Sequence, residues 1–327
     1  MNHDNLITRI DLDDPHSSAA LEAEQRLFGH YGLEPKSHFV EMEEPQLRLR
    51  VLEVGDGPPL LMVPGGAGDA WPYAPLMAEL SGWRMIVLNR PGSGLSDGID
   101  HRAVDVRQLA TETLRAVANA FELERVPIVS NSMGGLWSFW YALDYPERVA
   151  AMAQMGCPAL VLDTSAPLFM RLLGVPGING LIAPVLQPKD VDSALEGMRT
   201  QGSTQEDIER QPVEIAEAAY YFWNLPTYLD TWKTLIAAVA TLTGASPRYR
   251  LGSDQLARVQ QPVQFVWGPR DPFGGIGVAQ EALQNISDAR LHEIRSGHLP
   301  FLDQPQETGR VIREFLSQNG NGRGDRA

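Results

Sequence analysis

A serine in a tight turn between a buried strand and a helix is the first residue whose setting predicts chemistry. Ser132 follows the apolar run Pro127–Val129 and precedes the helical segment Gly135–Tyr145. Its neighbours two positions away, Ser130 and Gly134, are small, as the cramped backbone of a nucleophile elbow requires. Ser130 stands where that motif commonly has glycine. The pattern predicts a nucleophile, and a purely structural serine turn is the alternative.

An acid and a histidine follow two later strands in the order that a catalytic triad needs. Asp271 lies in a Gly/Pro turn after the apolar run Val263–Trp267, and His298 follows a predicted strand at Arg290–Ile294. Asp also occurs in such turns for turn chemistry alone. The chain order Ser132, Asp271, His298 is nevertheless the triad order of strand–helix hydrolases. We expect His298 to act as the base and Asp271 to orient it.

A glycine-rich turn, Val63–Gly68, follows a further apolar run. A dinucleotide loop needs the spacing G-x-G-x-x-G, and a phosphate loop needs Gly-Lys-Ser/Thr. Neither pattern is present, which disfavours a nicotinamide-dependent oxidoreductase. The better interpretation is an oxyanion hole whose donors are the backbone N–H groups of Gly66 and Met133. This chemistry requires no organic cofactor and no metal ion.

The surrounding pattern predicts a sheet that brings these turns to one edge. Alternation of apolar and polar residues from Phe39 to Val51 is typical of antiparallel strands. Short continuous apolar runs such as Leu60–Val63 and Met85–Leu88 suit parallel strands covered on both faces. Helical segments lie between the runs. We therefore predict an α/β fold with a doubly wound, mostly parallel sheet.

One long stretch, residues 160–259, interrupts the alternation of strands and helices. It is rich in Leu, Met and aromatic residues at helical spacing and has no obvious strand, which predicts a helical cap. The sheet domain would then comprise residues 38–159 and 260–318. Residues 1–37 form a predicted N-terminal extension, and the polar tail 319–327 is predicted to be disordered.

Together these motifs resemble the α/β-hydrolase superfamily from about Phe39 to Leu316. Asn89–Asp97 is similar to the family's D-x-R-G-x-G-x-S loop, and Gly297–Pro305 is similar to its G-H-x-x-x-x-E-x-P ending, with Asp303 in place of Glu. The family's usual His-Gly before the oxyanion residue is Pro64-Gly65 here. The resemblance implies an eight-stranded sheet, a cap that covers the site and a serine-hydrolase activity.

The cap sequence favours a hydrophobic substrate. Trp223 and other aromatic residues of the cap recur at helical spacing, although each one taken singly is more commonly part of a cap's own core. We predict that Asn131, Trp223 and Leu299 contact a small hydrophobic molecule. The predicted function is cleavage of a carboxylic ester, or a related acyl compound, through an acyl-enzyme on Ser132.

Other activities share the same triad. The elbow Asn131–Gly135 is also similar to that of the carbon–carbon bond hydrolases that cleave ring-fission dienoates. Those enzymes use a cap arginine to hold the substrate carboxylate and usually have Trp directly after the catalytic His, where this chain has Leu299. Possible cap partners for such a carboxylate are Arg171, Arg199, Arg248 and Arg250. A triad-retaining small-molecule receptor, acyl transfer, thioester hydrolysis and peptidase activity are further alternatives.

Composition excludes several classes of partner. The chain has 41 acidic and 27 basic residues and a formal net charge of −14, which argues against nucleic acid and anionic membranes as partners. Its single cysteine, Cys157, excludes an internal disulfide. The N-terminus lacks the features of a signal peptide, and no apolar run reaches roughly 18 residues. We expect a cytoplasmic protein.

Overall fold

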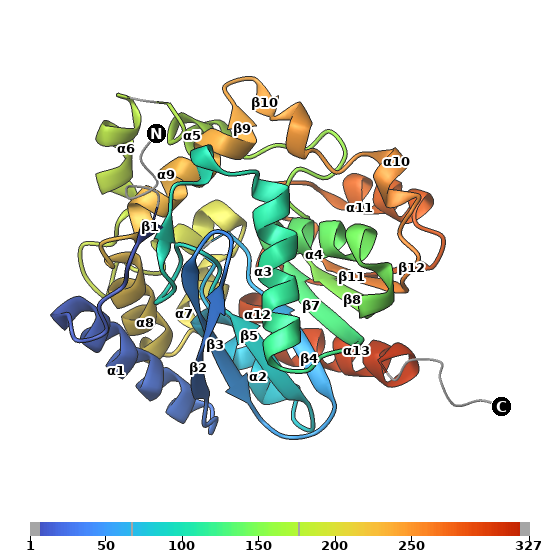
Figure 1. The fold of residues 1–327 in the computed structure, drawn as a ribbon, viewed down its shortest axis with the longest axis horizontal. Helices are drawn as coiled ribbons and strands as arrows, with labels where there is room; N and C mark the ends of the chain where they lie inside the picture. Colours follow the sequence, from blue (N-terminus) through green and yellow to red (C-terminus); the bar gives the residue numbers. More distant parts are fainter. Residues whose placement is uncertain (1–6, 67, 176, 321–327) are drawn as a thin grey trace.

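The computed structural model describes residues 7–66, 68–175 and 177–320. An eight-stranded sheet with the order β12-β11-β8-β7-β4-β5-β3-β2 lies at its centre (Figure 1). Only the pairs β2–β3 and β3–β5 are antiparallel. The prediction of a doubly wound, mostly parallel, eight-stranded sheet is therefore confirmed. The strands are β2 Lys36–Met42, β3 Leu47–Val54, β4 Pro59–Val63, β5 Arg84–Leu88, β7 Val126–Asn131, β8 Val149–Met155, β11 Val263–Trp267 and β12 Ala289–Glu293.

Helices cover both faces of this sheet, and the apolar residues divide between two buried clusters accordingly. On one face lie α3 (Val106–Ala120), α4 (Ser132–Asp144) and α11 (Ile276–Asn285). On the other lie α2 (Ala74–Glu79) and α13 (Pro305–Asn319). In β4, Leu61 and Val63 belong to the first cluster, and Leu60 and Met62 to the second. This alternation explains why the central strands are continuous apolar runs rather than polar–apolar repeats.

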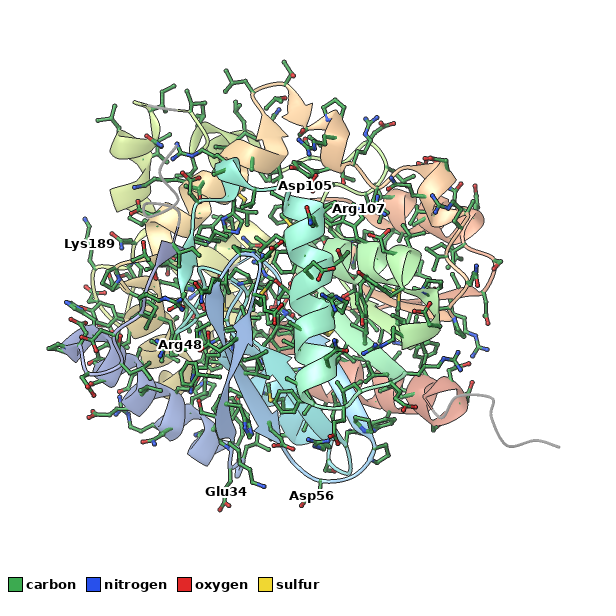
Figure 2. The ribbon with its side chains drawn as sticks, in the orientation of Figure 1. Glu34, Arg48, Asp56, Asp105, Arg107 and Lys189 are labelled. Atoms are coloured by element: carbon green, nitrogen blue, oxygen red, sulfur yellow. The ribbon has the colours of Figure 1, made fainter. Side chains whose placement is uncertain are left out.

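Local signals set the helix ends. Asp105 precedes α3, and its carboxylate accepts hydrogen bonds from the backbone N–H groups of Arg107 and Gln108, at 2.9 and 3.1 Å (Figure 2). Helix α4 has no such capping side chain, because the strand β7 runs directly into it at Ser132. The sequence pattern predicts this helix only from Gly135 onwards, whereas in the structure it begins at Ser132.

A cap over residues 160–259 stays a prediction; the chain between β8 and β11 forms short helices. They are α5 Leu168–Leu172, α6 Asn179–Leu186, α7 Gln205–Glu209, α8 Val213–Trp223, α9 Tyr228–Val239 and α10 Ser253–Leu256. The segment also contains a small hairpin of β9 (Ala240–Thr241) and β10 (Gly244–Ala245). The sequence pattern did not indicate it, because strands of two residues show no periodicity.

The N-terminal extension packs onto both the sheet and the cap. Strand β1 (Ile7–Thr8) pairs with β6 (Gly98–Ile99), and helix α1 (Pro15–His30) lies against the cap helix α8 (Figure 1). A buried ion pair joins Glu24 of α1 to Arg50 of β3, with hydrogen bonds of 2.5 and 3.0 Å. At the other end, α13 includes Asn319; most of the predicted disordered tail, residues 321–327, lies outside the described residues.

Candidate active site

Ser132 occupies a strained turn at the end of β7. Its φ of 51° lies in the left-handed region that residues with a side chain rarely adopt. A Cβ on Gly134 would lie 2.1 Å from the carbonyl oxygen of Val63, so the residue two positions after the serine has to be glycine. Two positions before it, the buried Ser130 hydroxyl donates to Gln154 Oε1 at 2.8 Å. That hydrogen bond explains how the elbow accommodates serine in place of glycine.

The turn after β11 holds the acid in a fixed orientation. Asp271 Oδ2 accepts hydrogen bonds from the backbone N–H of Cys157 at 2.8 Å and from His298 Nδ1 at 2.7 Å. Its Oδ1 accepts from the backbone N–H of Phe273 at 2.9 Å. Because an ionised carboxylate only accepts, Nδ1 of His298 carries the proton. The other ring nitrogen, Nε2, is then the atom able to act as a base.

His298 is anchored through its backbone as well as its ring. Its N–H donates to the carbonyl of Gln201 in the cap at 2.7 Å, and its carbonyl accepts from Asn131 Nδ2 at 3.0 Å. Asp303 supports the preceding turn, since it accepts from the N–H of Gly297 at 2.8 Å and from the Ser203 hydroxyl at 2.7 Å. The aspartate that replaces the family's usual glutamate therefore still reaches the histidine loop.

The predicted residues of the triad meet at one cavity. Ser132 and His298 both line it, while Asp271 lies behind the histidine. Within the described part of the chain, the buried Nε2 of His298 has no hydrogen-bond partner, so it is free to accept a proton. Cys157 is no competing nucleophile, because burial and the neighbouring Asp271 carboxylate raise the pKa of its thiol well above the usual value.

The two predicted oxyanion residues line the same cavity as Ser132 and His298. Gly66, in the turn after β4, and Met133, in the first turn of α4, both line the cavity. The turn is close to the nucleophile: a Cβ on Gly65 would lie 3.2 Å from Ser132 Cβ and 2.3 Å from Asn131 Oδ1. Ala67, the next residue of the glycine-rich motif, lies outside the described residues.

The cavity measures about 250 Å³ and is mainly apolar. Its floor consists of residues at the carboxyl ends of the strands, and the floor includes Gly65, Gly66, Asn131, Ser132 and His298. Its ceiling consists of apolar and aromatic side chains from α5, α8 and α9, namely Phe169, Met170, Ile215, Trp223, Tyr228 and Trp232.

All three predicted substrate-contacting residues line the cavity. Trp223 stacks on Tyr228 with ring centroids 6.2 Å apart, and Leu299 follows His298. Asn131 differs from the other two, because its amide nitrogen already donates to the carbonyls of Met155 and His298, at 2.7 and 3.0 Å. Its substrate contact remains a prediction, while its role in joining the elbow to the histidine loop is visible.

No arginine or lysine is among the described residues that line the cavity, and the one carboxyl group among them is that of Asp69. The four arginines considered above as partners for a substrate carboxylate make their contacts outside the cavity. Arg171 donates to the carbonyl of Leu242, and the other three form ion pairs outside the cavity. These pairs are Arg199–Glu196, Arg248–Asp105 and Arg250–Asp163.

Two charged residues beside the floor were missed by the sequence analysis. Arg90 follows β5 and is 1% exposed, and its Nη2 donates to the carbonyls of Gly65 and Gly66, at 2.5 and 2.7 Å. Burial raises the pKa of the nearby Asp69 carboxyl to about 8 and lowers the pKa of Arg90 to about 10. The sequence carries a signal for Arg90, since a charged residue shortly after an apolar strand is placed for burial; the similarity of Asn89–Asp97 to the family's loop assigns it no role.

The described residues show neither a metal-binding cluster nor a membrane-spanning helix. They contain no group of three or more His, Cys, Asp or Glu side chains arranged to hold a metal ion. Among the helices of these residues, none has the length and apolar character needed to cross a membrane.

The fold and site together define an α/β hydrolase. Residues 58–305, well over half of the chain, match the family model described as alpha/beta hydrolase fold, and the chain belongs to this family. Among curated relatives, it is 24% identical over 305 residues to a 2-hydroxy-6-oxo-6-phenylhexa-2,4-dienoate hydrolase of Comamonas testosteroni, covering 86% of this chain and 96% of the relative. It is 26% identical over 281 residues to a 2-hydroxy-6-oxononadienedioate/2-hydroxy-6-oxononatrienedioate hydrolase of Paraburkholderia phymatum, covering 84% and 92%.

Solved structures of a carboxylesterase and of a carbon–carbon bond hydrolase both share this fold. A carboxylesterase of Bacillus subtilis superposes with a TM-score of 0.67 at 17% identity, covering 92% of this chain and 99% of the other. A 2-hydroxy-6-oxo-6-phenylhexa-2,4-dienoate hydrolase of Rhodococcus superposes with a TM-score of 0.68 at 18% identity, covering 87% and 99%. The predicted resemblance to the superfamily, and to its carbon–carbon bond hydrolases, is confirmed.

Proposed function

We propose that this α/β hydrolase cleaves a carboxylic ester, or a related acyl compound, of a small hydrophobic substrate through an acyl-enzyme on Ser132. The observation that carries the proposal is the meeting of three features at one cavity. These are a serine in a strained elbow, a histidine oriented by a buried acid, and an apolar lining with no arginine or lysine among its described residues.

In the proposed mechanism, His298 Nε2 takes the proton of the Ser132 hydroxyl as Oγ attacks the substrate carbonyl carbon. The N–H groups of Gly66 and Met133 stabilise the resulting oxyanion, a contribution of about 2.7–4 kcal/mol per donor in related sites. Asp271 stabilises the imidazolium that forms. His298 then protonates the departing alcohol, and a water molecule activated by the same base hydrolyses the acyl-enzyme.

The lining of the cavity favours a neutral substrate. Apolar and aromatic side chains of the ceiling would bury an uncharged acyl or alcohol group favourably. A substrate carboxylate would instead enter a cavity whose described lining residues include no arginine or lysine to pair with it. Transfer of an ionised group into such surroundings without a partner is costly.

Carbon–carbon bond cleavage is the second candidate, and the dienoate hydrolases among the relatives favour it. The substrates in the names of these relatives are carboxylates, and the four arginines expected as partners for such a group make their contacts outside this cavity. We therefore place ester hydrolysis first. A receptor that retains the triad is a third candidate, distinguished by binding without turnover.

A substrate panel tests the proposal. The purified chain and its Ser132→Ala variant would be assayed with p-nitrophenyl esters of increasing acyl length and with a ring-fission dienoate. We expect ester turnover by the wild type and a loss of at least about a thousandfold in the variant. A clear preference for the dienoate would replace the ester assignment, and labelling by a serine-directed phosphonate without turnover of any ester would favour the receptor.

A further inference from the structure

A buried arginine lies behind the oxyanion loop, and the triad mechanism does not use it. Arg90 is almost wholly buried, and one of its nitrogens, Nη2, donates to two successive backbone carbonyls, those of Gly65 and Gly66. Burial of a guanidinium in a protein interior is unfavourable, and the hydrogen bonds that it makes offset part of this cost. We infer that these hydrogen bonds hold the backbone of the loop at Gly65 and Gly66 in place.

Because the peptide group is planar, the contact of Arg90 with the Gly65 carbonyl also sets the direction of the Gly66 N–H. In a trans peptide the carbonyl and the N–H of the next residue point in opposite directions. The carbonyl of Gly65 is held by Arg90 and also accepts from the N–H of Gly68 at 2.9 Å. The N–H of Gly66 belongs to the same peptide, so it points away from Arg90. On its other side, the loop packs against Asn131 and Ser132.

The guanidinium is held from a second side by the helix that carries the nucleophile. Its carbon lies 5.0 Å from the ring centroid of Trp137 in α4, a cation–π contact inside the core. Arg90 therefore joins the oxyanion loop to the nucleophile helix. Because this region is buried, a positive charge at the carbonyl end of the peptide also polarises it, which strengthens its N–H as a donor.

We propose that Arg90 is a positioning residue for the reaction: it holds the peptide between Gly65 and Gly66 so that the Gly66 N–H faces the oxyanion, and its charge strengthens that donor. The inference rests on the serine-hydrolase function proposed above. Arg90 itself touches neither the substrate nor the reacting atoms.

The test compares Arg90→Met and Arg90→Lys with Arg50→Met. Arg50 is a similarly buried arginine that pairs with Glu24 and does not line the cavity, and it serves as a control for the loss of a buried cation. For each folded variant we would measure kcat and KM for a p-nitrophenyl ester, the rate of phosphonate labelling at Ser132, and the melting temperature.

We expect Arg90→Met to lower kcat about 10- to 100-fold, somewhat less than the loss of a whole oxyanion donor, with KM changed by less than about threefold. Phosphonate labelling should slow by a similar factor, because the phosphoryl oxygen occupies the same hole. Arg90→Lys should lose about three- to tenfold in kcat, since a compact ammonium cannot contact the two carbonyls and at the same time place a planar cation over Trp137. Arg50→Met should melt at a lower temperature with kcat unchanged.

Wild-type kcat in folded Arg90→Met would overturn the proposal. If that variant does not fold, Arg90→Lys decides, and an unchanged kcat in it contradicts the positioning role. Labelling separates this failure from failure of the proposed function. A wild-type chain that is neither labelled nor active defeats the serine-hydrolase assignment. A labelled wild type with equally fast labelling of both Arg90 variants defeats only the role of Arg90.

Discussion

The floor and the ceiling of the cavity are held in different ways. Hydrogen bonds between separate loops fix the floor: Asn131 joins the elbow to the histidine loop, and Asp271 accepts from three donors. The ceiling consists of stacked and packed apolar side chains such as Trp223 and Tyr228. Directional bonds fix atoms to within fractions of an ångström, whereas apolar packing tolerates changes of shape. We infer that the floor sets the chemistry and the ceiling sets the choice of substrate.

The largest effect should follow from a change to the acid behind the floor. Asp271→Asn replaces an oxygen that accepts from backbone N–H groups and from His298 by an amide with donor hydrogens, which favours the wrong histidine tautomer. We expect kcat to fall about 10³- to 10⁴-fold with little change in KM. Asp163→Asn, at an exposed ion pair, is the control and should keep full activity. A loss of less than tenfold in Asp271→Asn would show that the acid does not orient the base.

A methyl group added to the floor should have the next largest effect. In Gly65→Ala the new Cβ would lie 2.3 Å from Asn131 Oδ1, whose amide is already fixed by two backbone carbonyls, so the oxyanion loop must move. We expect kcat to fall about 10- to 100-fold. Gly29→Ala in α1 meets no atom within 4 Å and is the matched control. Equal kcat values in the two variants would contradict a rigid floor.

The ceiling should respond through specificity. Trp223→Ala removes a large part of the apolar lining, and we expect kcat/KM for long-chain esters to fall about tenfold, while the rate for an acetyl ester changes less than about twofold. Trp83→Ala changes a tryptophan that does not line the cavity and should leave the acyl-length profile intact. If Trp223→Ala slows all esters equally, the ceiling contributes to the chemistry and the division between the two regions is wrong.

The smallest effect concerns stability rather than rate. Burial raises the pKa of Asp69 in the folded chain to about 8, whereas an unfolded Asp has a pKa near 4. Between these values the folded chain keeps a proton that the unfolded chain has lost, so the free energy of unfolding should fall as the pH rises through this range.

Denaturant unfolding at pH 5.5 and pH 7.5 measures this effect. Asp69→Asn should weaken the fall of stability with pH, whereas Asp56→Asn, at the exposed turn between β3 and β4, should not (Figure 2). Identical pH dependence in Asp69→Asn and the wild type would show that the carboxyl is not protonated in the fold.

The sequence predicts the floor better than the ceiling for a physical reason. Ser132, Asp271 and His298 each lie in the turn that follows a strand, and parallel strands bring their carboxyl ends to one edge wherever the intervening chain runs. The identity of the ceiling depends on how helices pack, which apolar spacing alone does not determine. Spacing marked Trp223 as a lining residue but gave no reason to select Phe169 or Ile215 from α5 and α8.

Contacts between segments that are distant in the chain could not be predicted from the sequence either. The role of Arg90 requires the loop after β5 to meet the loop after β4, and each loop alone looks like an ordinary turn. The N-terminal extension has an apolar helical stripe, yet its position against α8 depends on contacts across almost two hundred residues, such as the ion pair of Arg26 and Glu217.

Trapping of the acyl-enzyme tests the central claim most directly. The wild-type chain would be mixed with a p-nitrophenyl ester, quenched with acid within milliseconds, digested and mapped by mass spectrometry. The proposed mechanism predicts a burst of p-nitrophenol approaching one per chain and the acyl mass on the peptide that contains Ser132. Steady turnover of the ester with the acyl group on another residue, or with Ser132→Ala fully active, would contradict it.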